Sequence, residues 1–263
     1  MANLNRWAAK WRLFEFDERH DAVVEIDCTD RGNIATRLVH ATNETAALQR
    51  FAESIAQIQT VLANCEVAVL SPAEIAFRWR GLEFARARMG ADPGTFRSKQ
   101  EIVFGVGAEE RVLDDRNWAF FVQLLTALRE ARHPYRARGL FRMHPERWLE
   151  SLVRADLSLI DERLETESVY SQVPAFSAAD RAMIDVLTLT REGRLAVVEL
   201  KADEDIHLPL QGLDYWARVQ WHHGRGEFLK FGYFGGRELS AEAPLLFLVA
   251  PGLRVHPATD VIL

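Results

Sequence analysis

Three charged side chains stand at the ends of two apolar segments and have the residue types needed for chemistry on a phosphate. Asp185 lies near the start of one segment, and Glu199 and Lys201 lie at the end of the next. In an extended strand alternate side chains share a face, so Glu199 and Lys201 point to the same side. The turn expected at 191–194 is almost midway between Asp185 and Glu199. A hairpin would therefore bring the two carboxylates opposite each other, beside the ammonium group.

Two carboxylates with open coordination positions suit Mg²⁺ or Mn²⁺, which prefer oxygen ligands and keep several waters. A lysine beside them could orient a water, or help to deprotonate it, for in-line attack on a phosphate while the metal offsets the developing charge. The same spacing also fits a simpler arrangement. In that alternative, Glu199 and Lys201 form an ion pair at a sheet edge, and Asp185 only solvates a strand end.

The order of these residues resembles a known signature. Asp185 followed by the Glu199-Leu200-Lys201 segment is similar to the D…(D/E)xK motif of the PD-(D/E)XK nuclease superfamily, which has the restriction-endonuclease-like fold. Ile184 stands where the literal signature has proline, a change that many members share. The resemblance extends over roughly residues 142–250, the C-terminal half of the chain.

Two flanking motifs strengthen the resemblance. The segment from Glu146 to Leu149, ERWL, is similar to the E-R-x-L of archaeal Holliday-junction resolvases. The segment from Gln211 to Tyr215, QGLDY, is similar to the Q-x-x-x-Y that follows the ELK strand in several branches, including NucS-like endonucleases. The expected order of elements, helix, strand, hairpin, helix and strand, matches the αβββαβ core of the family.

The resemblance implies roles for individual residues. Asp185 and Glu199 would be ligands of Mg²⁺ or Mn²⁺, together with the backbone carbonyl of Leu200. Lys201 would position the attacking water and stabilise the phosphate. Gln211 would contact the water, the lysine or the DNA backbone.

Two further residues are implied by the flanking motifs. Tyr215 would contact nucleic acid. An upstream helical glutamate would join the metal site in a catalytic role. Glu146 fits the motif, and Glu150, one turn later, would lie on nearly the same helix face, so we favour Glu146 and keep Glu150 as the alternative.

The implied activity is metal-dependent hydrolysis of DNA phosphodiester bonds, with DNA as the partner. A homodimer would fit, because members of the family often pair two sites to cut two strands. The alternative is a non-catalytic nucleic-acid-binding or protein-interaction module on the same fold. The joint presence of Asp185, Glu199, Lys201 and Gln211 favours an enzyme, because functional decay is expected to break at least one of them. A third interpretation is an unrelated α/β protein in which the ExK segment is an edge ion pair.

A second set of residues suggests contact with nucleic acid. Four arginines alternate with aromatic and small residues before and after Gly81: Arg78, Arg80, Arg86 and Arg88. Such a stripe could bind phosphates while the aromatic rings stack on bases. The simpler interpretation is a strand with an apolar core face and an arginine-coated solvent face.

The elements that must position these residues fall into two parts. We predict an α/β chain with an N-terminal α+β domain at 1–135, a linker at 136–144 and a restriction-endonuclease-like domain at 145–263, with a mixed central sheet flanked by helices. The expected elements of the C-terminal domain are helices at 146–153 and 208–221 and strands at 169–176, 182–190, 195–201, 228–234 and 245–249. In the N-terminal domain we expect strands at 11–16, 22–27, 34–39, about 72–80 and 102–106, and helices at about 43–62 and 114–128.

The composition limits which classes of protein the chain can belong to. The chain has 263 residues, of which 48% are hydrophobic. Its formal net charge of −6 argues against a generally basic nucleic-acid coat, although net charge says little about local fields. No apolar run approaches the roughly 20 residues that cross a bilayer. Two cysteines, Cys28 and Cys65, cannot build a disulfide framework or a cysteine zinc site. With no apolar signal segment at the N-terminus, we expect a cytoplasmic protein without membrane partners.

Overall fold

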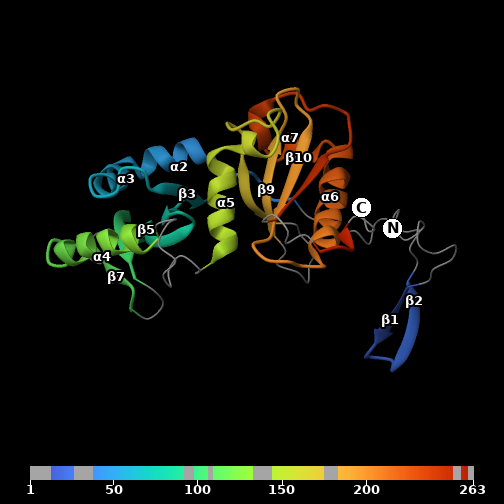
Figure 1. Cartoon of the computed structure of the whole chain (residues 1–263), viewed down its shortest axis with the longest axis horizontal. Helices are drawn as coiled ribbons and strands as arrows, with labels where there is room; N and C mark the ends of the chain where they lie inside the picture. The colour runs from blue at the N-terminus through green and yellow to red at the C-terminus, as the bar shows by residue number, and fades with distance from the viewer. Residues whose placement is uncertain are drawn as a thin grey trace. The chain divides into compact units, whose positions relative to one another are not determined.

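A computed structural model of the chain describes residues 13–26, 38–91, 98–105, 109–132, 144–174, 183–250 and 256–259. The chain folds as two compact units, one formed by residues 40–159 and the other by residues 1–39 and 160–263. Each unit contains strands and helices, as Figure 1 shows. The chain is therefore α/β, which confirms the predicted class.

The unit of residues 40–159 is built on a five-stranded sheet with the order β3-β4-β5-β6-β7, in which all neighbours are antiparallel. Helices accompany this sheet, and α2 contacts β3 and β4. The strands are β3 (Glu66–Ser71), β4 (Glu74–Trp79), β5 (Leu82–Ala91), β6 (Ser98–Phe104) and β7 (Arg111–Val112). The helices are α2 (Glu44–Arg50), α3 (Ala52–Gln59) and α4 (Trp118–Ala131).

Aromatic residues from three strands and one helix form the core of this unit. Phe77, Phe84 and Phe104 project from β4, β5 and β6, and Phe121 projects from α4 against them. The rings of Phe104 and Phe121 meet edge to face with centroids 5.0 Å apart, an arrangement that aromatic pairs favour. Alternating apolar residues on the strands and the apolar face of α4 therefore meet in one layer, which fixes the sheet beneath the helix.

Helix α5 (Pro145–Ala155) packs on this same unit, around its Trp148 side chain. The guanidinium carbons of Arg80 and Arg132 lie 5.4 and 4.8 Å from the Trp148 ring centroid. Each of these arginines also donates to the backbone carbonyl of the other, at 2.7 and 3.0 Å. Gly81 has φ +73°, and a Cβ there would lie 2.0 Å from the carbonyl oxygen of Arg147, so only glycine fits under α5.

The helix predicted at 146–153 is thus present, but its contacts differ from those expected. The sequence predicts this helix at the start of the C-terminal domain. In the structure the boundary between the two units falls after Leu159, and Ser151 of α5 donates to the Glu66 carboxylate of β3. A short 3₁₀ helix, Leu157–Leu159, ends this unit.

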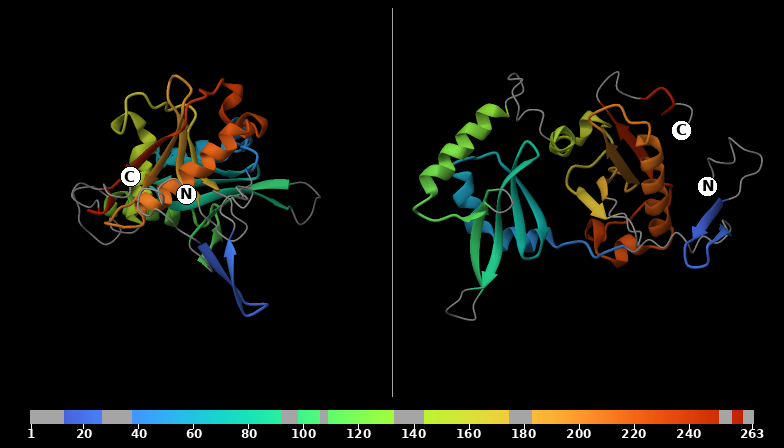
Figure 2. Two further views of the ribbon diagram at one scale, coloured as in Figure 1. Left: turned by 90° about the vertical axis from the view of Figure 1, so that its right-hand side faces the viewer. Right: turned by 90° about the horizontal axis from the view of Figure 1, so that it is seen from below.

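The second unit contains a four-stranded mixed sheet with the order β11-β10-β9-β8. Strands β8, β9 and β10 are antiparallel neighbours, whereas β10 and β11 are parallel and are joined through α6. Figure 2 shows α6 lying along this sheet, where it contacts β10 and β11. The bounds are β8 (Tyr170–Pro174), β9 (Met183–Leu189), β10 (Leu195–Leu200), α6 (Leu208–Gly224) and β11 (Leu245–Val249). The predicted elements at 169–176, 182–190, 195–201, 208–221 and 245–249 are confirmed.

The strand predicted at 228–234 is wrong. This segment forms the short helix α7 (Glu227–Lys230) and a 3₁₀ turn at Tyr233–Gly236. Gly226 and Gly232 have φ of +65° and +80°, so the backbone turns before and after α7 instead of extending. These turns let Phe228 and Tyr233 pack edge to face at 5.5 Å in the core. The apolar residues of this segment thus reach the core by turns rather than by strand alternation.

The remaining N-terminal predictions are partly met. Strands β1 (Leu13–Asp17) and β2 (Ala22–Ile26) pair as an antiparallel hairpin, near the expected 11–16 and 22–27. The third expected strand, at 34–39, lies mostly outside the described residues. The helix expected at 43–62 is two helices that meet at Phe51, and the strands β3 and β5 were not predicted from the sequence.

In the described ranges, no helix combines the length and the apolar character needed to cross a membrane.

Candidate active site

The register of the β9–β10 hairpin places Asp185 and Glu199 together. The pairs run from Leu195 opposite Leu189 to Val198 opposite Val186. One further step in this register sets Glu199 against Asp185. Directly opposite residues in an antiparallel pair point to the same face, with Cβ atoms about 5 Å apart. The convergence of two carboxylates that the spacing predicts is therefore supported by the register.

Asp185 is attached to β10 by its side chain. Its Oδ2 accepts a hydrogen bond from the backbone N–H of Leu200 at 2.9 Å. Leu200 is buried, so this bond satisfies a donor that water does not reach. The bond also holds the Asp185 carboxylate at the end of β10, next to the residue that precedes Leu200.

Glu199 is a charged residue in an otherwise apolar strand. Only 1% of its surface is exposed, and the rest of β10 is equally buried. In the parallel pair of β10 and β11, Glu199 is aligned with Leu248. A Cβ added to Gly212 of α6 would lie 2.5 Å from Leu248 Cδ2, so α6 approaches this face closely. Helix α6 therefore covers the face that carries the Glu199 carboxylate.

Two residues of α6 lie over the carboxylates. Gln211 Nε2 donates to Tyr215 Oη at 2.9 Å, and Tyr215 is only 3% exposed. Burial raises the pKa of the Tyr215 hydroxyl, and the negative charges of Glu199 and Asp185 raise it further. Both carboxylates thus act on the same hydroxyl, which groups Asp185, Glu199, Gln211 and Tyr215 in one site.

Lys201 directly follows β10. Its backbone N–H donates to the carbonyl of Val249 at 2.9 Å, so the chain is still paired with β11 at this position. Its side chain is half-buried. Since the strand continues to Lys201, alternation places its side chain on the same face as that of Glu199. The structure therefore brings together the predicted residues Asp185, Glu199, Leu200, Lys201, Gln211 and Tyr215.

The two helical glutamates belong to the other unit. Glu146 and Glu150 are on α5, which packs on the sheet of residues 40–159. Glu146 is exposed, whereas Glu150 is buried and its charge acts on the guanidinium of Arg78. Within the unit that carries Asp185, the described residues form the site without either glutamate. The catalytic role of Glu146 stays a prediction.

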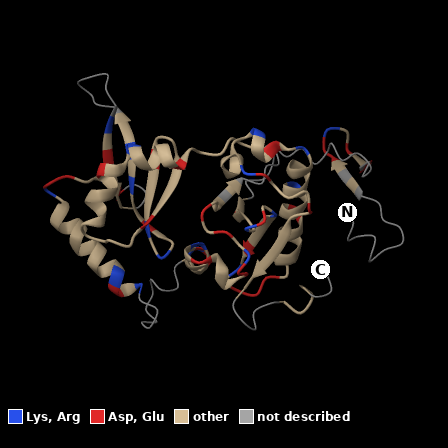
Figure 3. Ribbon diagram, turned by 90° about the horizontal axis from the view of Figure 1, so that it is seen from above, with Lys and Arg blue, Asp and Glu red and all other residues tan. Residues whose placement is uncertain are grey.

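The four arginines of the predicted stripe are bonded within their own unit. Arg86 forms ion pairs with Glu83 and, at 3.5 Å, with Glu74. Arg88 pairs with Glu101 at 2.6 Å, and Arg78 lies 3.8 Å from Glu83. Arg80 stacks on Trp148 and donates to a carbonyl group, as described above. Figure 3 shows basic and acidic residues side by side on these strands. This face therefore alternates in charge, which weakens the attraction that a uniform arginine stripe would have for phosphates.

In the described part of the chain, no group of three or more histidine, cysteine, aspartate or glutamate side chains is arranged to hold a metal ion. The carboxylates of Asp185 and Glu199 form only a pair. They are the residues of this site with the oxygen donors that Mg²⁺ and Mn²⁺ prefer.

Two features of the site were not predicted from the sequence. The bond from Leu200 N–H to Asp185 depends on the detailed end of the hairpin, which no motif encodes. The close approach of α6 at Gly212 did leave a signal, because a glycine in the interior of a helix is disfavoured unless packing requires it.

Comparisons of the chain with protein-family models, with curated proteins and with solved structures find no match. Its function is therefore inferred from the residues and their geometry.

Proposed function

We propose that the chain is a metal-dependent nuclease that hydrolyses DNA phosphodiester bonds. The observation that carries this proposal is the register of the β9–β10 hairpin, which runs to Val198 opposite Val186. One further step would set Asp185 against Glu199, two residues before Lys201. Two carboxylates and a lysine at the end of a buried hairpin, beneath a helix that carries glutamine and tyrosine, are the groups that the PD-(D/E)XK resemblance implies. The order β8, β9, β10, α6, β11 also follows the expected βββαβ sequence.

The donor set fits a hard divalent cation. Like charges directly opposite each other in a strand pair repel, and a cation between Asp185 and Glu199 would offset that repulsion. Their carboxylates would hold Mg²⁺ or Mn²⁺, together with the carbonyl of Leu200. When bound, the ion would lower the pKa of a coordinated water and offset charge on the phosphate.

The other residues of the site would position the attacking water and stabilise charge on the phosphate. The ammonium group of Lys201 would orient the attacking water and offset charge on a phosphate oxygen. Tyr215 accepts a hydrogen bond from the amide nitrogen of Gln211. The amide oxygen of Gln211 would then contact the water or Lys201. Tyr215 would thus act on the reaction by holding Gln211.

A cleavage assay tests the proposal. The purified chain is incubated with labelled single-stranded, duplex and branched DNA in Mg²⁺ or Mn²⁺, beside the Lys201→Ala variant. We expect cleavage of at least one substrate by the wild type, its loss in EDTA, and a loss of at least a hundredfold in the variant. Equal cleavage by both proteins would contradict the proposal, as would no cleavage by either.

A second function is favoured by the presence of Lys201 itself. Its ammonium group, on the face that carries both carboxylates, could offset their charge with no metal ion. The chain would then be a non-catalytic module of the same fold that binds nucleic acid or protein. Binding of the DNA panel without cleavage, unchanged by EDTA, would favour this alternative. A cytoplasmic location and a homodimer remain parts of the proposal.

A further inference from the structure

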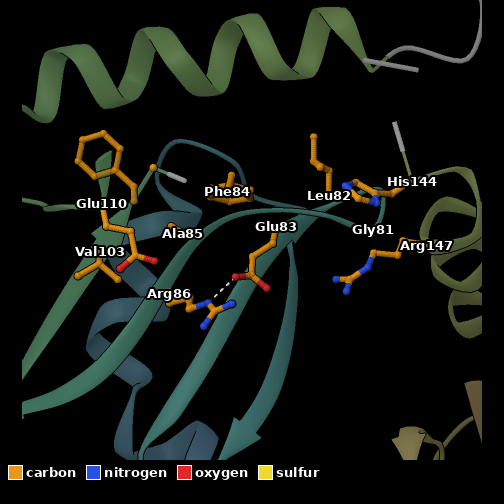
Figure 4. A pocket seen from close by; sticks show the side chains of 12 residues that line it. Gly81, Leu82, Glu83, Phe84, Ala85, Arg86, Val103, Glu110, His144 and Arg147 are labelled. Atoms are coloured by element: carbon orange, nitrogen blue, oxygen red, sulfur yellow. Dashed lines mark hydrogen bonds and ion pairs between the residues drawn. The ribbon is translucent and has the colours of Figure 1, made fainter. Parts of the chain in front are cut away.

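A pocket in the unit of residues 40–159 is separate from the carboxylate site. Its volume is about 340 Å³, and it is lined by the first half of β5, the end of β6 and the start of α5. Figure 4 shows its side chains. Pockets for small ligands have volumes of about 300–1,000 Å³, so this one suits a ligand of the size of a single nucleotide.

The charges of the pocket are separated. Arg147 and His144 of the α5 start lie on one side, and Glu110 lies on the opposite side (Figure 4). Arg86, between them, is bonded to Glu83. Among the described residues no carboxylate forms an ion pair with Arg147. The pocket thus has one cationic end, one acidic end and a neutralised middle.

The start of α5 makes the cationic end more positive. Burial, and to a smaller extent the charge of Arg147, lowers the pKa of the Arg78 guanidinium, but Arg78 lies 3.8 Å from Glu83 and adds no free charge to this end. His144 precedes the first residue of α5, and its side chain does not cap the helix. The partial positive charge of the helix start adds to that of Arg147. A phosphate group matches this end better than a neutral group, because arginine binds phosphate oxygens in a fork.

The wall between the two ends includes the apolar residues Leu82, Phe84, Val103 and Phe104. Leu82 is half-buried, whereas the other three are more than 90% buried and present little surface to the pocket. An organic ring would therefore contact mainly Leu82, and burial of this apolar surface would be favourable. Glu110 could then accept a hydrogen bond from an amino group on the far side of the ring.

We propose that this pocket binds a nucleotide, an organic phosphate with a ring that bears an amino group. The phosphate lies at Arg147 and His144, the ring lies on the apolar wall, and the amino group donates to Glu110. The nucleotide has two chemical sources, a free mononucleotide or the phosphorylated end of a strand. The proposal does not depend on the metal site, because no residue of that site lines the pocket.

Calorimetric titration of the full chain in EDTA tests this binding. The probes are AMP, UMP, adenosine and inorganic phosphate, and an oligonucleotide with and without a 5′-phosphate. We expect AMP to bind, adenosine to bind at least tenfold more weakly, and Arg147→Gln to weaken AMP binding by about tenfold or more. Arg129→Gln, an exposed arginine on α4 outside the pocket, is the matched control and should bind AMP as the wild type does.

Further titrations identify the contact of the ring and the source of the nucleotide, either a free mononucleotide or a strand end. UMP lacks the ring amino group and should bind more weakly than AMP, a difference that Glu110→Ala should remove because it deletes the acceptor. Preference for the phosphorylated oligonucleotide over AMP assigns a strand end, and the reverse preference assigns a free nucleotide. The proposal is overturned if none of the probes that carry a phosphate group binds, or if Arg147→Gln binds AMP as tightly as the wild type does. Circular dichroism should confirm that Arg147→Gln is folded, because the Arg147 side chain is exposed. Since EDTA is present, either result is independent of nuclease activity.

Discussion

The Asp185 carboxylate accepts a hydrogen bond from the backbone N–H of Leu200 at 2.9 Å. This bond joins the start of β9 to the end of β10, which carries Glu199 and precedes Lys201. The candidate site is thus held by a paired hairpin, and a functional group held by rigid strands is positioned more accurately than one held by a loop.

Removal of this hydrogen bond should lower the free energy of unfolding. In Asp185→Ala the buried Leu200 N–H loses its acceptor, whereas in Asp185→Asn the amide oxygen can still accept. Both variants remove the charge. We therefore expect Asp185→Ala to be less stable to urea than Asp185→Asn by about 1–2 kcal/mol. Equal stability of the two variants would show that the bond contributes nothing.

The approach of α6 to β11 should tolerate no side chain at Gly212. Its Cβ would lie 2.5 Å from Leu248 Cδ2, so Gly212→Ala must displace that leucine or the helix. We expect a loss of about 1–3 kcal/mol of unfolding free energy, measured by urea denaturation. Gly224→Ala, at the end of the same helix, is the control because its Cβ would meet nothing within 4 Å. A cost for Gly224→Ala as large as that for Gly212→Ala would contradict the packing argument.

The hydroxyl of Tyr215 should affect cleavage more than stability. Tyr215→Phe keeps the buried ring but removes the acceptor for Gln211 Nε2, so the amide loses its fixed orientation. We expect single-turnover cleavage to fall by about 10- to 100-fold, as when a positioning partner of a metal site is lost. Tyr170→Phe is the matched control, because its hydroxyl accepts from Phe234 N–H in a different part of the unit. Equal cleavage by Tyr215→Phe and Tyr170→Phe would remove Tyr215 from the site.

The stability of the turn after α6 should depend on pH through the carboxyl group of Glu227. Hydrogen bonds from Arg225 and then His222 lower the pKa of its carboxyl below 4.5. A carboxyl whose pKa is lower in the folded state stabilises the fold above its unfolded pKa. That contribution disappears as the pH falls through the folded pKa. We expect Glu227→Gln to be less stable than wild type at pH 7 by about 1 kcal/mol, and this difference to shrink as the pH falls below 4.5. Glu204→Gln, a substitution in an exposed loop, is the control. A difference for Glu227→Gln that does not shrink in acid would contradict this role.

The sequence predicts the hairpin well because its signals are local. Apolar runs with a turn between them define β9 and β10, and the register that the turn sets, continued by one step, places Asp185 opposite Glu199. The roles of these residues stay predictions. The helix with Gln211 and Tyr215 has its own apolar periodicity, so its presence over the hairpin follows from the expected order of elements.

The features that the sequence could not reveal depend on the backbone conformation of single residues or on contacts between distant ones. The strand predicted after α6 is wrong because left-handed glycines at 226 and 232 turn this segment into helical pieces. Helix α5 packs in the unit of residues 40–159, where Gly81 and Trp148 fit together, which neither segment reveals alone. The nucleic-acid role of the arginines of β4 and β5 stays a prediction, and strand pairing sets glutamates such as Glu101 beside them.

The central claim is that Asp185 and Glu199 share a divalent metal ion, and direct titration with Mn²⁺ tests it. Free Mn²⁺ is followed by its paramagnetic resonance signal for the wild type, Asp185→Asn, Glu199→Gln and the control Glu204→Gln. We expect saturable binding by wild type and control, and at least tenfold weaker binding by the other two variants. No saturable binding at millimolar Mn²⁺, or equal binding by wild type and Asp185→Asn, would contradict the claim.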